Sequence, residues 1–322
     1  MCRLSSVVEQ RFCKPLVGSS NLSAGSSAPV HHRLLARLAA ATVLWGVAAI
    51  AMADGGHHSF WSVKGAHNTL YLLGSVHVLK PEDSDLPPDS LRAYDNAKAL
   101  VMELDLNNIS VESLLGTDLS EEMLPEGHTL AEALGPAAYG KFVAHLQPLG
   151  VEPDFFNQFQ PWFAAISLEQ LELARMGFES GSGVDEQFAA RAQTDHKPII
   201  ALETVEQQLG IFAHLSLDEQ RRFMLYTLDD AEDTAGATDA VISAWRTGDT
   251  KSLEQLLSES YAQYPELFRM LTTDRNRAWL PVITGLLHED QDYLVIVGAL
   301  HLVGKDGIVQ LLQQQGFQVV QH

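Results

Sequence analysis

Two histidines occur in the same short context near opposite ends of the 322-residue chain. His77 lies in YLLGSVHVL at 71–79, and His301 lies in VIVGALHLV at 295–303. In both places an apolar run typical of a buried β-strand leads into Gly-x-x-His. Imidazole nitrogens bind metal ions and move protons near neutral pH. The repeated motif therefore makes these two histidines the first candidates for a functional site.

Carboxylates follow two other strand-like runs. Glu103 and Asp105 end the run ALVMELDL at 99–106, and Glu203 ends HKPIIALE at 196–203. In open sheets of parallel strands, ligands bind beyond the carboxyl ends of the strands. If these runs are neighbouring parallel strands, their acidic side chains and the two histidines lie at one edge of a sheet.

This set of side chains suits a divalent metal. Two histidines and one carboxylate form a known catalytic ligand set that leaves a position for water, and the metal acidifies that water. We expect His77, Glu103 and His301 to be the ligands. A second carboxylate, Glu203 or Asp105, would act as general base or orient a ligand. Glu203 could instead serve as the first residue of a helix, where carboxylates are favoured.

Two arginines stand on one predicted helix, DRNRAWLPVITGLL at 274–287. Arg275 and Arg277 both suit surface ion pairs, but one of them could bind a substrate carboxylate or a developing oxyanion. We assign that role to Arg277, with Arg275 as the alternative.

Other kinds of chemistry are excluded by missing motifs. The chain has no Gly-x-Ser-x-Gly, no His-Glu-x-x-His and no phosphate-binding glycine-rich loop. Its two cysteines, Cys2 and Cys13, lie at the front, so thiolate metal sites and cysteine nucleophiles are excluded from the rest of the chain. The net charge of −20 repels phosphates and argues against a nucleic-acid partner.

The spacing of apolar residues predicts an α/β fold with a mostly parallel central sheet. Strands are expected at 60–65, 68–75, 99–106, 196–203, 293–300 and 317–320, and helices at 87–98, 136–150, 161–177, 216–233, 238–248, 252–264, 274–287 and 306–316. The expected strand at 68–75, helix at 87–98 and strand at 99–106 form a βαβ unit, which predicts that the two strands are a parallel pair. Both ends of the mature chain supply strands, with a large helical insert between them.

The front of the chain has the layout of a secretory signal. A basic stretch at 31–37 precedes a 16-residue apolar run at 38–53 that ends in Ala-Met-Ala. This run is shorter than the roughly 20 residues that span a bilayer, so cleavage after Ala53 is expected, with no stable membrane span afterwards. Residues 1–30 are interpreted as an extension from a misassigned start. We expect residues 54–322 to form a single domain in the periplasm or outside the cell.

The chain resembles the TraB/GumN family, which is related to the Tiki metalloproteases and more distantly to the erythromycin esterases. The resemblance covers residue 60 to the end and depends on the order of several segments: YLLGSVHVL, ALVMELDL, LPEGHTLAEAL, FQPWFAAISLEQLEL, GVDEQFAARAQTDHKPIIALETVEQQL, DRNRAWLPVI and VIVGALHLVGKDGIVQLLQQQGF. It implies a metal-dependent peptidase whose site residues are His77, Glu103 and His301. The implied metal is manganese or cobalt, and zinc fits the same ligands.

Three functions stay open on this evidence. The first is an exported metal-dependent hydrolase that acts on a peptide or small-molecule substrate. The second is a metal-free esterase in which His77 acts as general base, as the erythromycin-esterase relatives suggest. The third is a protein that binds haem or another ligand without catalysis. The sequence does not distinguish oligomeric states.

Overall fold

The computed structural model describes residues 58–108, 121–179, 181–230, 234–260, 262 and 264–322. The predicted extension at 1–30 and the predicted signal at 31–53 lie outside the described residues. In the part of the chain that the structure describes, no helix is both long enough and apolar enough to cross a bilayer.

A mixed sheet carries the fold, with six strands in the described residues. They are β1 (Phe60–Lys64), β2 (Thr69–Ser75), β3 (Ala99–Met102), β4 (Ile199–Ala201), β5 (Tyr293–Gly298) and β6 (Val319–Gln321), in the order β4-β3-β5-β2-β1-β6. Strands β4, β3, β5 and β2 are parallel. Only β1 runs against its two neighbours. The predicted α/β class is therefore confirmed, and the predicted parallel sheet is confirmed in part, for the three pairings among β4, β3, β5 and β2.

The predicted pairing of the early βαβ unit is wrong in one respect. Strand β2, helix α2 (Pro88–Asn96) and strand β3 follow one another, but β5 lies between the two strands and pairs with both. Val295 of β5 is opposite Leu72 on one side and Val101 on the other. The reason is burial: β5 is covered on both faces and is apolar throughout, which suits a central strand better than an edge strand.

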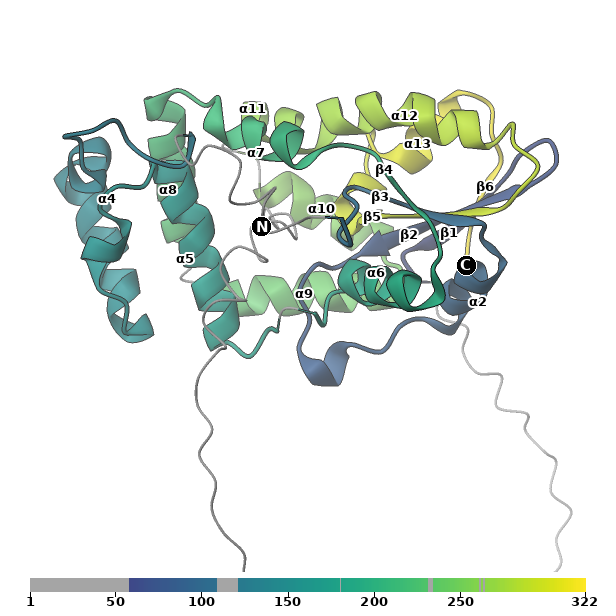
Figure 1. Ribbon diagram of the computed structural model, residues 1–322, viewed down its shortest axis with the longest axis horizontal. Helices are drawn as coiled ribbons and strands as arrows, with labels where there is room; N and C mark the ends of the chain where they lie inside the picture. Colours follow the sequence, from purple (N-terminus) through teal and green to yellow (C-terminus); the bar gives the residue numbers. More distant parts are fainter. Residues whose placement is uncertain (1–57, 109–120, 180, 231–233, 261, 263) are drawn as a thin grey trace, which may run out of the picture.

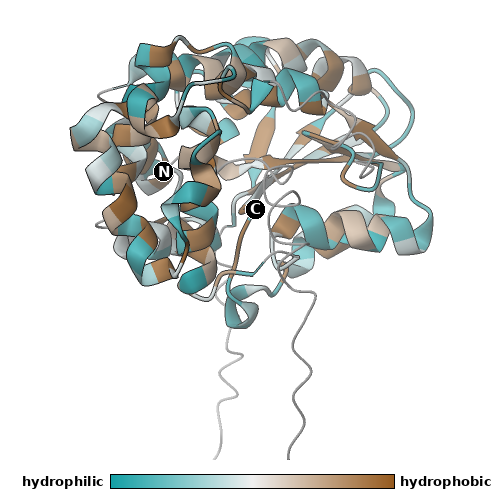
Figure 2. Ribbon diagram, turned by 60° about the vertical axis from the view of Figure 1, so that its left-hand side comes forward, coloured by the Kyte–Doolittle hydropathy of each residue, from teal (hydrophilic) through white to brown (hydrophobic). Residues whose placement is uncertain are grey.

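Helices cover both faces of the sheet (Figure 1). Val295 and Val297 of β5 pack on one face with α12 (Asp274–Leu286) and α13 (Ile308–Gln314), while Leu294 and Ile296 face the opposite core. That second face is covered by α2 and α6 (Val184–Asp195). This alternation is the two-residue period of a strand. Figure 2 shows the strands coloured mostly as hydrophobic and the helices striped with hydrophilic residues.

The chain between β3 and β5 is mainly helical, as predicted, and contributes only the short β4 to the sheet. Its remaining helices are α4 (Leu130–Leu146), α5 (Pro161–Arg175), α7 (Val205–Ala213), α8 (Leu217–Asp230), α9 (Thr234–Thr247), α10 (Thr250–Ser260) and α11 (Pro265–Phe268). Helices α4, α5 and α8 lie together beside the sheet (Figure 1). The Trp162 ring of α5 stacks on Phe212 of α7 at 6.0 Å, which joins this helical group to the segment after β4.

A close backbone contact joins the end of β2 to the start of α6. The Val184 amide donates to the Val76 carbonyl at 3.0 Å. A Cβ atom on the preceding Gly183 would lie 2.0 Å from the carbonyl oxygen of His77. Real Cβ atoms do not approach a carbonyl this closely, so only glycine lets α6 begin against the strand end that carries His77.

We expect Gly183→Ala to destabilise the protein, because its methyl group must push the β2–α6 junction apart. The free energy of unfolding should fall by about 1–3 kcal/mol, the usual cost of overpacking, in a denaturant titration. Gly140→Ala is the matched control: Gly140 lies in α4 with open space around it, so alanine should raise stability by about 0.5–1 kcal/mol. Equal stabilities of the two variants would contradict the close-contact account.

Candidate active site

Four chemically active side chains gather at the carboxyl edge of the parallel strands. His77 lies two residues beyond β2, and Glu103 follows β3 directly. Glu203 lies two residues beyond β4, and His301 ends the short 3-10 helix that follows β5. The chain turns sharply at each strand end, so residues up to 224 positions apart can face a common centre.

Gly298 marks that centre. A Cβ atom built on it would lie 3.4 Å from Nε2 of His77, 3.4 Å from Oε1 of Glu103 and 3.5 Å from Cδ2 of His301. The Gly298 amide also donates to Oε1 of Glu103 at 2.8 Å. A side chain at this position would fill the space among the two imidazoles and the carboxylate, and glycine leaves that space available.

The tautomer of His301 follows from its neighbours. The Asn276 amide nitrogen donates to the carbonyls of His301 and Asp306 at 3.1 Å and 2.9 Å, so its Oδ1 must face the His301 ring. Nδ1 of His301 lies 2.7 Å from that oxygen and donates to it. Burial, with the nearby charge of Arg275, lowers the pKa of His301 to about 3. The ring is therefore neutral and carries its lone pair on Nε2.

His77 is held in the same way by a carboxylate. Its Nδ1 lies 3.1 Å from Oδ2 of Asp185, at the N-terminal turn of α6. Carboxylates are common in the first turn of a helix, so the start of α6 is a favourable place for Asp185. A carboxylate on Nδ1 fixes the ring orientation and increases the basicity of Nε2. Both histidines therefore present Nε2 toward the centre.

Arg275 of α12 occupies the middle of the cluster. Nη2 donates to Glu103 at 2.5 Å and to Glu203 at 2.6 Å, and Nε donates to Glu203 at 3.1 Å. Nη1 donates to Nε2 of His301 at 3.1 Å and to the Leu271 carbonyl at 3.0 Å. These five contacts use all five N–H groups of the guanidinium.

The pKa values of Glu103 and Glu203 shift in opposite directions. Burial by itself raises the pKa of Glu103, but the charge of the Arg275 guanidinium outweighs burial and lowers the pKa to about 2. For Glu203, burial outweighs the charge of Arg275 and raises the pKa. Two neighbouring carboxyl groups with separated pKa values are a common basis for acid–base roles.

A capping box positions Glu203. The Thr204 side chain accepts from the Gln207 amide, and the Gln207 side chain accepts from the Thr204 amide, which starts α7. The first turn of α7 then brings Gln208 beside Glu203, to whose Oε1 it donates at 2.8 Å. The Glu203 amide also donates to the Glu103 carbonyl at 3.0 Å, so the strand-end backbones set the spacing of the two carboxylates.

Two predicted residues lie elsewhere. Arg277 is on the surface with its side chain 63% exposed, and it pairs with Asp306 at 3.1 Å. Asp105 closes a turn by accepting from the Asn107 amide and from the Asn108 side chain. Of the two arginines, Arg275 therefore lies among the other candidate residues, and a role for Arg277 stays a prediction.

The donors suit a divalent metal in chemical type, because they are two imidazoles and a carboxylate. Oε1 of Glu103 and Nε2 of His301 lie 3.9 Å apart, near the roughly 3.3 Å that separates ligands of a tetrahedral zinc. However, no group of three or more His, Cys, Asp or Glu side chains in the described ranges is spaced to hold an ion. Arg275 lies among these donors and already binds the lone pair of His301.

Polar atoms around the centre lack partners among the described residues. They are the hydroxyl of Ser75, Oδ1 of Asp185 and Oε1 of Gln208, all buried. Buried polar atoms are normally hydrogen-bonded, so these point to a solvent or ligand site. A cavity of about 10 Å³ lies beside His77 and Glu103, between Ser75 and Asp185, which is close to the smallest size that holds one water.

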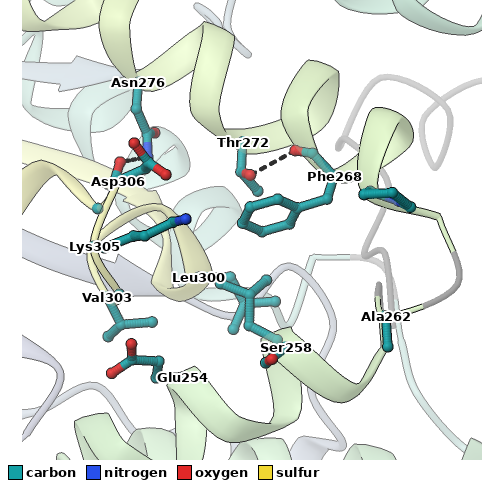
Figure 3. A pocket seen from close by; sticks show the side chains of 14 residues that line it. Glu254, Ser258, Ala262, Phe268, Thr272, Asn276, Leu300, Val303, Lys305 and Asp306 are labelled. Atoms are coloured by element: carbon teal, nitrogen blue, oxygen red, sulfur yellow. Dashed lines mark hydrogen bonds between the residues drawn. The ribbon is translucent and has the colours of Figure 1, made fainter.

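A larger pocket lies on the other side of Asn276 (Figure 3). Its volume is about 380 Å³, and it is bounded by α10, α11, the start of α12 and the loop after His301. Leu300, Val303 and Phe268 give it an apolar lining, while Lys305 brings a cationic group to its rim (Figure 3). Asn276 thus contacts both the pocket and the ring of His301.

Sequence reasoning missed Asp185, Asn276 and Gln208. Asp185 contacts a histidine 108 positions away in the sequence, so no local pattern links the two residues. The first turn of α12 is polar throughout (Asp-Arg-Asn-Arg), so no signal in the sequence marked out Asn276. For Gln208, the signal was its place one turn after Glu203 at a helix start.

These features define a class: an α/β protein with a buried histidine–carboxylate–arginine centre at the carboxyl edge of its sheet. Residues 59–321 match the model of the TraB/PrgY/gumN family, and the chain belongs to that family. The resemblance inferred from the sequence is therefore confirmed.

Curated relatives include bacterial and animal proteins. The chain is 26% identical over 243 residues to the uncharacterized protein YbaP of Escherichia coli (strain K12), which covers 76% of this chain and 87% of YbaP. It is 23% identical over 312 residues to the metalloprotease TIKI2 of Xenopus tropicalis and to the metalloprotease TIKI1 of Danio rerio. Each match covers 80% of this chain but only 58% and 62% of those relatives. No solved structure matches the chain.

We expect Glu103→Gln to lower the free energy of unfolding by about 3 kcal/mol, because it removes one partner of a buried ion pair. Denaturant titration at neutral pH measures this change. Arg277→Gln is the control, since it breaks an exposed ion pair on α12, the helix that also carries Arg275. It should lower the free energy of unfolding by at most about 1 kcal/mol. Similar losses in both variants would show that the buried centre is not a special source of stability.

Proposed function

We propose that this protein is an exported metal-dependent hydrolase that cleaves peptides at the centre formed by His77, Glu103 and His301. One observation carries the proposal: the imidazoles of His77 and His301 and the carboxylate of Glu103 converge on Gly298. Each histidine is oriented through Nδ1 by its own hydrogen-bond acceptor. The relatives named metalloproteases support the reaction class. The proposal that the protein is exported depends on the signal-like layout of residues 31–53.

Nε2 of His77, Nε2 of His301 and Oε1 of Glu103 would hold a divalent ion, with manganese, cobalt and zinc as the candidates. When bound, such an ion polarises a substrate carbonyl and acidifies a water molecule. Asp185 and Asn276 act through the histidines, because they fix which ring nitrogen faces the ion. The small cavity between Ser75 and Asp185 supplies a place for water next to these ligands.

Glu203 and Arg275 complete the proposed chemistry. Glu203 is the second carboxylate at the centre and would accept the proton of the attacking water, then return it to the leaving amine. Arg275 would stabilise the negative charge that develops on the carbonyl oxygen. This assigns to Arg275 the role first expected of Arg277, because only Arg275 contacts the other site residues.

A metal-free hydrolase is the second candidate. It is favoured by the contact of Arg275 with His301 and by the lack of a metal-spaced group in the part of the chain that the structure describes. Here His77, oriented by Asp185, would act as general base on an ester or amide. The two candidates differ in one measurable property, which is the response of activity to a chelator.

The test measures cleavage of a fluorogenic peptide library by purified protein after chelation and after return of manganese, cobalt or zinc. We expect activity to vanish on chelation and to return with one of these ions. His77→Ala and His301→Ala should each lose activity by more than about 100-fold. His288→Ala, at an exposed position, is the control and should keep full activity.

Two results would contradict the proposal. Hydrolysis that survives complete metal removal would favour the metal-free candidate. Hydrolysis by none of the metal-loaded samples, with folded protein confirmed by circular dichroism, would leave only a binding function, including the haem-binding alternative.

A further inference from the structure

The guanidinium of Arg275 lies where the proposed metal site needs its donors. It contacts Nε2 of His301, which is a proposed ligand atom, and Oε2 of Glu103, the oxygen next to the proposed ligand atom Oε1. It also binds Glu203 through two nitrogens. Its side chain is only 12% exposed. A buried cation among ligand atoms is therefore the main feature of this site in the described chain.

The competition for His301 is direct. Nδ1 of this ring donates to Asn276, so Nε2 holds its one available lone pair. Nη1 of Arg275 already donates a hydrogen bond to that lone pair at 3.1 Å. A metal ion bonds through the same lone pair, so the ion and this hydrogen bond exclude each other.

Glu203 can keep the Arg275 guanidinium paired when its contacts with His301 and Glu103 are broken. Its two oxygens accept from Nη2 and Nε at 2.6 Å and 3.1 Å in a two-point contact, the strongest geometry for a guanidinium and a carboxylate. The guanidinium also stacks on the Trp279 ring at 4.6 Å. Arg275 can therefore release His301 and Glu103 while its charge remains compensated.

We propose that Arg275 is an internal counter-cation that competes with the metal ion for the lone pair of His301 and for the negative charge of Glu103, sets the metal affinity of the site, and stays paired with Glu203 when the ion binds. The proposal depends on the proposed metal site. Without the ion, Arg275 compensates the charge of the buried carboxylates and keeps the site folded. With the ion, its released N–H groups face the centre and can receive a substrate carbonyl or carboxylate.

The test titrates Co²⁺ into metal-free full-length protein and follows visible absorption and heat. Arg275→Met keeps an apolar stem beside Trp279 but removes the competing donors. We expect it to bind Co²⁺ at least about tenfold more tightly than the wild type, since the ion no longer displaces a charge-assisted hydrogen bond. Its metal-free form should unfold at a lower temperature, and saturating Co²⁺ should raise its melting temperature more than that of the wild type.

Two variants sharpen the result. Arg275→Lys keeps the charge but has a single donor centre, so its Co²⁺ affinity should lie between those of the wild type and Arg275→Met. It also serves if Arg275→Met does not fold without metal. Arg277→Gln removes an exposed arginine two residues away and should leave Co²⁺ affinity unchanged.

The outcomes separate this inference from the proposed function. If folded Arg275→Met or Arg275→Lys binds Co²⁺ no more tightly than the wild type, Arg275 does not compete and the inference is wrong, while the metal site stands. If neither the wild type nor the variants bind Co²⁺, Mn²⁺ or Zn²⁺, the metal site itself is wrong. If His77→Ala leaves the tightened binding of Arg275→Met intact, the ion is bound elsewhere, and the inference is again overturned.

Discussion

One buried cation holds the centre of this protein together. The guanidinium of Arg275 bonds to two carboxylates and one imidazole that come from three different strand ends. None of these groups would be stable so far from water without a partner, because desolvating a charge is costly. The site and the fold are therefore coupled: the carboxyl edge of the sheet can close over charged groups only while their charges are compensated.

Strands and helices make different contributions to this site. The parallel strands fix the spacing of Glu103, Glu203 and His301, since their backbones are hydrogen-bonded in register. The helices then supply the residues that orient them, with Asp185 from the start of α6 and Asn276 from the start of α12. Gly183 lets the start of α6 approach the strand end that carries His77, and Gly298 leaves space among the side chains of His77, Glu103 and His301.

Local patterns in the sequence predicted the strands, most of the helices and the strand-end positions of the two histidines. They could not predict that β5 lies between β2 and β3, because strand order depends on which run is buried on both faces. Nor could they choose between Arg275 and Arg277. That choice depended on which face of α12 is buried: Trp279 and Ile283, four and eight residues after Arg275 on the same face, are buried in the structure. Asp185 was missed because its partner is remote in the chain.

The convergence of His77, Glu103 and His301 is the central claim, and a crystal structure of the protein soaked in Mn²⁺ or Co²⁺ tests it most directly. The account predicts an anomalous-scattering peak bonded to Nε2 of both histidines and to Glu103, beside Gly298, with the Arg275 guanidinium withdrawn toward Glu203. Imidazole rings that face different sides of the sheet, or a metal peak remote from Gly298, would contradict it.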